Sequence, residues 1–374
     1  MNILIAPNAF KNALDAQSVG EAIAEGLKES KLVGEFFVLP IADGGDGSLD
    51  IVTRYHQAKI YQIEVPGPLG RQVEARYGFN DVTATGVVEL AEASGIRRLT
   101  ADELNPWNAN TKGTGTIIRH LVSNGCKHII LTIGGSASID GGLGILAGLG
   151  VKFFSEGKPF NPVGPCDFHK ITAIDTSDTQ QFLKGTKFTI LSDVENLLMG
   201  QFGAVRVYGS QKGVQADEME KFEHSMAHWV ALLEKYTTKD IKLMKSGGAS
   251  GGVPVGLAAF FDVEILQGAD EILRLADMQS YLDKSEVVIT TEGQIDAQTS
   301  YGKGPGLVAK IASDQGKKVI GLCGQIDDDY NPHKSYFDIA LAINTKLCPL
   351  NIAIARTSSN LQYMGMQIGN LLAD

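Results

Sequence analysis

One stretch, residues 128–150 (HIILTIGGSASIDGGLGILAGLG), constrains the fold more than any other part of the chain. It opens with a run of apolar and β-branched residues, which is typical of a strand buried on both faces. A glycine-rich turn follows, and the small apolar residues at 143–149 then predict a helix. A buried strand that leads through such a turn into a helix favours an α/β fold with a parallel sheet.

The glycines of this turn allow two interpretations. In the first, backbone N–H groups wrap around an anion, two serines add hydroxyl donors, and Asp140 faces a metal ion or a proton. In the second, the turn is simply tight and its glycines serve only geometry. Similar turns recur at 41–48 (IADGGDGS) and 246–256 (SGGASGGVPVG), and this recurrence favours the binding interpretation.

The rhythm of predicted elements suggests two domains. Strands alternate with helices up to about residue 60 and again from residue 287, as in an open parallel sheet. Three strand-like segments after residue 60 read instead as an antiparallel meander: 60–65, 73–77 and 83–90. A chain of 374 residues is long for one compact core. We therefore predict a discontinuous domain, 1–60 with 285–374, interrupted by an inserted domain, 61–284, that carries the GGSASIDGG turn.

Charge and cysteine usage exclude several classes of partner. The net charge of −10 argues against nucleic acid and against an anionic membrane surface. No apolar stretch approaches the length of a membrane span. The four cysteines are far apart and form no CxxC pair, and the start, MNILIAPNAF, reads as a strand rather than a signal peptide. We expect a reduced, cytoplasmic protein.

Carboxylates among glycines follow several predicted strands: Asp43 and Asp46, Asp140, Asp193, and Glu292 with Asp296. In open α/β sheets, ligands bind beyond the carboxyl ends of the strands, and acids that meet there need Mg²⁺ or a shared proton. Acids combined with phosphate-binding turns point to metal-assisted phosphoryl transfer. The alternative for each acid is an N-cap of the following helix, which is favoured for Asp46 and weaker for Asp193. The chain has no GxxxxGK[ST] motif, so it is not a P-loop enzyme.

Seven motifs occur in the order found in the bacterial type I glycerate kinases: APNAFKNALDA (6–16), IADGGDGS (41–48), GGSASIDGG (134–142), SDVENLLMGQFGA (192–204), YGSQKG (208–213), GGASGGVPVGL (247–257) and TEGQIDAQTSYGK (291–303). The chain resembles this family along its whole length. The resemblance implies a discontinuous Rossmann-like parallel-sheet domain with a large inserted flavodoxin-like α/β domain and a cleft between them. It also implies ATP- and Mg²⁺-dependent phosphorylation of D-glycerate, with 2-phosphoglycerate as the favoured product.

The resemblance also suggests roles for individual residues. Asp193 would be the base that accepts the glycerate hydroxyl proton, and Lys11 with Lys212 or Lys303 would balance the developing charge. The expected substrate ligands are Asp43, Lys212, Gln294 and Lys303. The expected nucleotide-binding residues are Gly134, Gly135, Ser136, Ser138, Gly44 and Gly45. The expected metal ligands are Asp296, Glu292 and Asp140.

The chain departs from the family motifs at several positions. Asn8-Ala9 replaces Asp-Ser, Thr291 replaces Gly, and Gln294 replaces an Arg that could have held a carboxylate or phosphate. Smaller changes are Ser192 for Cys, and Leu197 and Ser210 for Pro. Two alternatives therefore stay open, a kinase of another small hydroxy acid and a catalytically silent sugar-acid sensor of the same fold. We expect a monomer or a homodimer.

Overall fold

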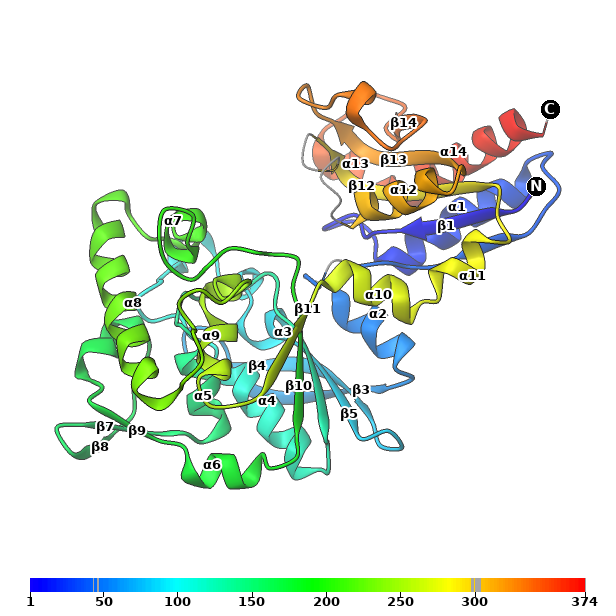
Figure 1. Cartoon of the computed structure of the whole chain (residues 1–374). Coiled ribbons are helices and arrows are strands. Elements are labelled where there is room, and N and C mark those ends of the chain that lie inside the picture. The colour runs from blue at the N-terminus through cyan, green and yellow to red at the C-terminus, as the bar shows by residue number, and fades with distance from the viewer. Residues whose placement is uncertain (43, 46, 297–298, 300–303, 374) are drawn as a thin grey trace. The chain divides into compact units, whose positions relative to one another are not determined.

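The computed structural model describes residues 1–42, 44, 45, 47–296, 299 and 304–373. The chain divides into two compact units, residues 1–43 with 269–374 (unit 1) and residues 44–268 (unit 2) (Figure 1). The change in the pattern of predicted strands and helices places the two domain boundaries near residues 60 and 284 instead. The first limit differs because helix α2 (Ser48–Tyr55) buries its apolar side against β4 and β5, strands that follow it in the chain. The second differs because α10 and α11 pack with unit 1.

Unit 1 contains a parallel sheet with the strand order β14-β13-β12-β1-β2. Its strands are β1 (Ile3–Pro7), β2 (Phe36–Val38), β12 (Val287–Ile295), β13 (Lys318–Ile326) and β14 (Ile339–Ala342). Numbered along this unit, the order is 2-1-3-4-5, which is the doubly wound order of flavodoxin and not the 3-2-1-4-5-6 order of the Rossmann fold. The strand order thus differs from the expected Rossmann-like label. It reverses between β1 and β12, which is where such sheets bind ligands.

Helices cover both faces of the unit 1 sheet (Figure 1). Helix α1 begins after Asp15, whose carboxylate caps the N–H of Ser18 at 2.9 Å. It packs closely on α14, since a Cβ at Gly26 would meet the backbone of Gln362. The helices of this unit are α1 (Ala16–Glu29), α10 (Gly268–Leu275), α11 (Met278–Leu282), α12 (Pro305–Asp314), α13 (Leu350–Ala355) and α14 (Thr357–Leu372). The last two are separate helices, because the chain leaves helical geometry at Arg356.

Unit 2 is built on a six-stranded sheet with the order β11-β10-β6-β5-β4-β3. Its strands are β3 (Lys59–Pro66), β4 (Gln72–Asn80), β5 (Thr85–Glu89), β6 (His128–Thr132), β10 (Lys187–Leu191) and β11 (Val263–Leu266). The first three form the predicted antiparallel meander, and the other pairs are parallel. The strands follow one another across this sheet in chain order. A flavodoxin-like sheet reverses its strand order once, so this sheet differs from the flavodoxin-like architecture that was expected.

A small second sheet, not anticipated from the sequence, joins β7 (Lys152–Ser155), β8 (Lys158–Phe160) and β9 (Ala173–Asp175). The helices of unit 2, besides α2, are α3 (Leu90–Ser94), α4 (Lys112–Ser123), α5 (Leu143–Leu149), α6 (Ser177–Phe182), α7 (Ala204–Tyr208), α8 (Met219–Leu233) and α9 (Val253–Ala258). None of the helices within the described ranges is both long enough and apolar enough to cross a membrane.

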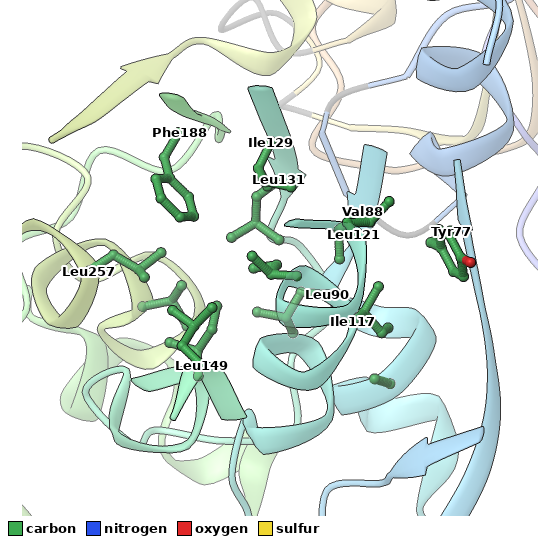
Figure 2. Packing of buried hydrophobic residues seen from close by; sticks show 14 of the residues in the cluster. Tyr77, Val88, Leu90, Ile117, Leu121, Ile129, Leu131, Leu149, Phe188 and Leu257 are labelled. Carbon is green, nitrogen blue, oxygen red and sulfur yellow. The ribbon is translucent and has the colours of Figure 1, made fainter. Parts of the chain in front are cut away.

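The main core of unit 2 lies between its sheet and a layer of helices (Figure 2). Ile129 and Leu131 of β6 face Ile117 of α4 and Leu149 of α5, and all four side chains are buried. Each fully buried aliphatic side chain contributes about 1.5–3 kcal/mol relative to exposure. This packing holds the carboxyl ends of β5, β6 and β10 at fixed positions, and the 134–142 turn and the 192–196 loop begin there.

Candidate active site

Two glycine-rich turns of unit 2 lie in direct backbone contact. The N–H of Gly134, just beyond β6, donates to the carbonyl of Gly44 at 3.2 Å. A Cβ at Gly134 would lie 2.4 Å from the Cα of Gly45, so only glycine allows this approach. The N–H of Gly134 therefore already has a partner within the protein. Glycine is needed at this position mainly because the two backbones approach each other so closely.

The third glycine-rich turn and the loop after β10 join the same cluster. The N–H of Gly141 donates to the carbonyl of Gly251 at 2.8 Å, so the 246–256 turn lies against the 134–142 turn. The N–H of Gly248 donates to the carbonyl of Asn196 at 2.9 Å, which brings in the 192–196 loop after β10. Glycine-rich segments that are remote in sequence thus gather at the carboxyl ends of the unit 2 strands. Asp193, half-buried, lies in the neighbouring 192–196 loop, which contains no glycine.

Lys212 supports the 134–142 turn from inside the protein. It ends a short 3₁₀ helix (Ser210–Lys212) and is only 4% exposed. Its Nζ donates to Ser136 Oγ at 2.6 Å and to the carbonyl of Ser138 at 2.8 Å. Burial lowers the pKa of Lys212 to about 7, although the charge of Asp140 opposes the shift. The ammonium group of Lys212, a predicted substrate ligand, thus binds the turn itself.

Asp140 lies beneath the same turn and is fully buried. Its carboxylate accepts hydrogen bonds from the N–H and hydroxyl of Thr111, both at 2.8 Å, and from the N–H groups of Gly144 at 3.0 Å and Gly142 at 3.3 Å. Burial raises the pKa of Asp140, and these hydrogen bonds oppose the shift. Four donors at the starts of α4 and α5 leave little room for a cation. The geometry favours the capping interpretation over the predicted metal ligand.

Two buried carboxylates at the end of β5 escaped the sequence analysis. Glu89 accepts from the N–H of Gly47 at 3.1 Å and from the N–H of Leu49 at 2.9 Å. Glu92 forms ion pairs with Arg76 at 2.8 Å and Arg97 at 3.0 Å. The signal for both was present, since two acids interrupt the otherwise apolar segment ELAEASG directly after a strand.

In unit 1, two threonines of β12 hold the end of β1 at the point where the strand order reverses. Thr290 Oγ1 donates to the carbonyl of Ala6 at 2.7 Å, and Thr291 Oγ1 donates to the carbonyl of Asn8 at 2.8 Å. Thr291, one of the departures from the family motif, therefore has a structural partner. Lys11 follows β1 on an exposed turn, near the place where doubly wound sheets bind ligands.

Further along β12, Glu292 and Asp296 share one neighbour. Thr299 donates its hydroxyl to Glu292 Oε2 at 2.9 Å and its N–H to Asp296 Oδ1 at 3.2 Å. Gln294, between them, donates from Nε2 to Asp327 Oδ2 at the end of β13. No cluster of three or more His, Cys, Asp or Glu in the described part of the chain is arranged to hold a metal ion alone. Two further predicted residues, Asp43 and Lys303, lie outside the described residues.

Parallel sheets with glycine-rich turns and acids at their carboxyl ends define an α/β protein of the kind that binds small molecules there. The chain belongs to the glycerate kinase family, whose family model matches residues 3–373. It is 34% identical to a Bacillus cereus glycerate kinase over 370 residues, which cover 98% of this chain and 97% of the relative. It is 31% identical to the Escherichia coli glycerate 2-kinase over 374 residues, 100% of this chain and 98% of the relative.

A solved structure agrees with this membership. A protein of Salmonella typhimurium LT2, solved as a candidate glycerate kinase 2, superposes with a TM-score of 0.85. It is 31% identical, and the match covers 100% of this chain and 98% of the other. The family resemblance drawn from the seven motifs is therefore confirmed.

Proposed function

We propose that this protein is an ATP-dependent glycerate kinase that transfers the γ-phosphoryl group of ATP to D-glycerate and releases ADP. The observation that carries the proposal is the gathering of glycine-rich turns, in a member of the glycerate kinase family, around the loop that holds Asp193. The favoured product is 2-phosphoglycerate, because one full-length relative is a glycerate 2-kinase.

Asp193 orients the hydroxyl group of glycerate and accepts its proton. An aspartate is a weak base at neutral pH. Positioning and electrostatic stabilisation therefore supply most of the barrier lowering. Lys11, at the end of β1, balances the charge that develops during transfer. The predicted glycerate ligands Asp43, Gln294 and Lys303 complete this assignment.

The 134–138 turn holds the phosphates of the nucleotide. Gly135, Ser136 and Ser138 supply the donors, with Gly44 and Gly45 beside them. The hydroxyl of Ser138 supports this role, because it is buried and has no hydrogen-bond partner among the described residues. Lys212 fixes the turn from below and does not bind glycerate directly.

Glu292 and Asp296 fit a magnesium site. Both carboxylates contact Thr299, so they lie close together, and Mg²⁺ in nucleotide sites typically uses one or two carboxylates plus substrate phosphates. When bound, the ion would neutralise charge on the phosphate oxygens. Asp140 is left out of this set because its oxygens face four protein donors. The expected cleft, the cytoplasmic location and the monomeric or homodimeric state stay predictions.

The substrate is tested by measuring ADP release with glycerate, glycolate, tartronate and lactate, followed by phosphorus NMR of the product. We expect turnover with glycerate to exceed the others and the spectrum to show phosphate on the 2-hydroxyl. Faster turnover with another acid would establish the alternative kinase. Ligand binding without ATP consumption would establish the sensor.

A further inference from the structure

We propose that Glu89 is a positioning residue that holds residues 44, 45 and 47–49 of the nucleotide site in their working place. The inference rests on the proposed function, in which Gly44 and Gly45 lie at the nucleotide phosphates. Glu89 is the last residue of β5 and its side chain is completely buried. It does not reach a reacting atom in this assignment, so its effect is exerted through the backbone that it holds.

The carboxylate of Glu89 caps helix α2 from another part of the chain. The helix starts after Gly47, which has a φ of 88° and no side chain with which to cap the helix itself. Both oxygens of Glu89 lie 3.1 Å from the N–H of Gly47, and Oε2 lies 2.9 Å from the N–H of Leu49. These are the N–H groups that a helix start would otherwise offer to a bound anion. The protein's own carboxylate already occupies them.

This cap fixes the residues that contact the nucleotide turn. Ser48 donates its hydroxyl to the carbonyl of Gly45 at 2.7 Å, so the anchored helix start holds the preceding turn. Gly44, next in line, accepts from the N–H of Gly134 and approaches the carbonyl of Leu191. Loss of the cap should therefore loosen the contact with the 134–138 turn and with the loop that follows β10.

Glu92 provides a matched control, because it is also a buried carboxylate that pairs with Arg97. Its remaining bonds go to Arg76 and Arg98, and no bond to residues 44, 45 or 47–49 is among those described for it. Replacing either glutamate by glutamine removes one buried charge and keeps the side-chain shape. A merely structural role would make the two variants behave alike.

The experiment compares wild type, Glu89→Gln and Glu92→Gln by amide hydrogen exchange and by steady-state kinetics. We expect the amides of Gly47 and Leu49 to exchange about tenfold faster in Glu89→Gln and at the wild-type rate in Glu92→Gln. We also expect the KM for ATP to rise about fivefold in Glu89→Gln alone. If Glu89→Gln does not fold, Glu89→Asp replaces it, since aspartate keeps the charge but is too short to reach both amides together.

Unchanged exchange of both amides, or an equal rise in KM for the two glutamine variants, would overturn the role of Glu89. A wild-type protein without glycerate-dependent ADP release would overturn the proposed function instead. The exchange rates of Gly47 and Leu49 would then decide alone whether Glu89 holds this segment.

Discussion

The ammonium nitrogen of Lys212 lies 2.6 Å from the hydroxyl oxygen of Ser136, and both side chains are buried. The two residues are 76 positions apart in the chain. A buried hydrogen bond is worth more than an exposed one, because little water competes for it. The 134–142 turn is therefore held in shape before any ligand arrives, and this would reduce the entropy lost on binding.

Replacing Lys212 by methionine removes both hydrogen bonds from Nζ to the turn. We expect the KM for ATP to rise about tenfold, which corresponds to the loss of one hydrogen bond to a charged group, while the KM for glycerate changes little. Lys184→Met is the control, because Lys184 is exposed. Steady-state kinetics with each substrate varied in turn measures both KM values. A rise in the KM for glycerate alone would restore Lys212 as a direct substrate ligand.

The buried ammonium group also predicts a pH dependence of stability. The folded protein releases the Lys212 proton near pH 7, whereas the unfolded chain keeps it up to the ordinary lysine pKa of 10.5. Between these values the unfolded state binds more protons, so the free energy of unfolding attributable to Lys212 rises with pH. Urea unfolding at several pH values between about 7 and about 9 should show that the free energy of unfolding of the wild type increases with pH relative to that of Lys212→Met. A constant difference between the two proteins contradicts this expectation.

Replacing Asp193 by asparagine separates the kinase from the sensor. Asparagine cannot accept the hydroxyl proton, so we expect ADP release to fall by about two orders of magnitude or more, with ATP affinity retained. Asp262→Asn serves as a control because Asp262 is a fully exposed acid of the same unit. A coupled assay of ADP formation gives the rate. Equal rates in wild type and Asp193→Asn would remove Asp193 from the mechanism.

A methyl group at Gly134 should force two turns apart. The added Cβ would lie 2.4 Å from the Cα of Gly45, and overpacking of this kind typically costs about 1–3 kcal/mol. We expect Gly134→Ala to unfold at lower urea concentration and to bind ATP more weakly. Gly293→Ala is the control for stability, because a Cβ there would meet no atom of the described residues within 4 Å, its chain neighbours aside. Equal stabilities of the two variants would show that the turns separate without cost.

Removal of the metal ion should abolish turnover, and Mg²⁺ should restore it. We expect Glu292→Gln to need about tenfold more Mg²⁺ for half-maximal rate, because magnesium sites of this kind depend on one or two carboxylates. Titration of Mg²⁺ into the metal-depleted variants measures this requirement. The same shift in Asp140→Asn, with none in Glu292→Gln, would reverse the assignment of the two acids.

The sequence located most elements because their signals are local. Helix α5 has the predicted limits, and the meander after residue 60 forms as expected. Strand β12, however, continues past its apolar first half as far as Ile295, because it pairs with β13 over that length. The small sheet of β7, β8 and β9 was missed, since its short strands carry no clear alternation. Pairing partners, and not propensity alone, set these lengths.

The candidate site shows the same division. The order of the motifs was enough to predict that the chain resembles the glycerate kinases, whereas ligand binding by the glycine-rich turns stays a prediction. The partners of Lys212, Asp140 and Glu89 became visible only in the folded chain. Each of these charged groups is buried, and burial requires a partner that packing brings from a distant segment. Periodicity and turn chemistry act over a few residues, so they determined the elements and their order, whereas the satisfaction of buried charges was decided by tertiary structure.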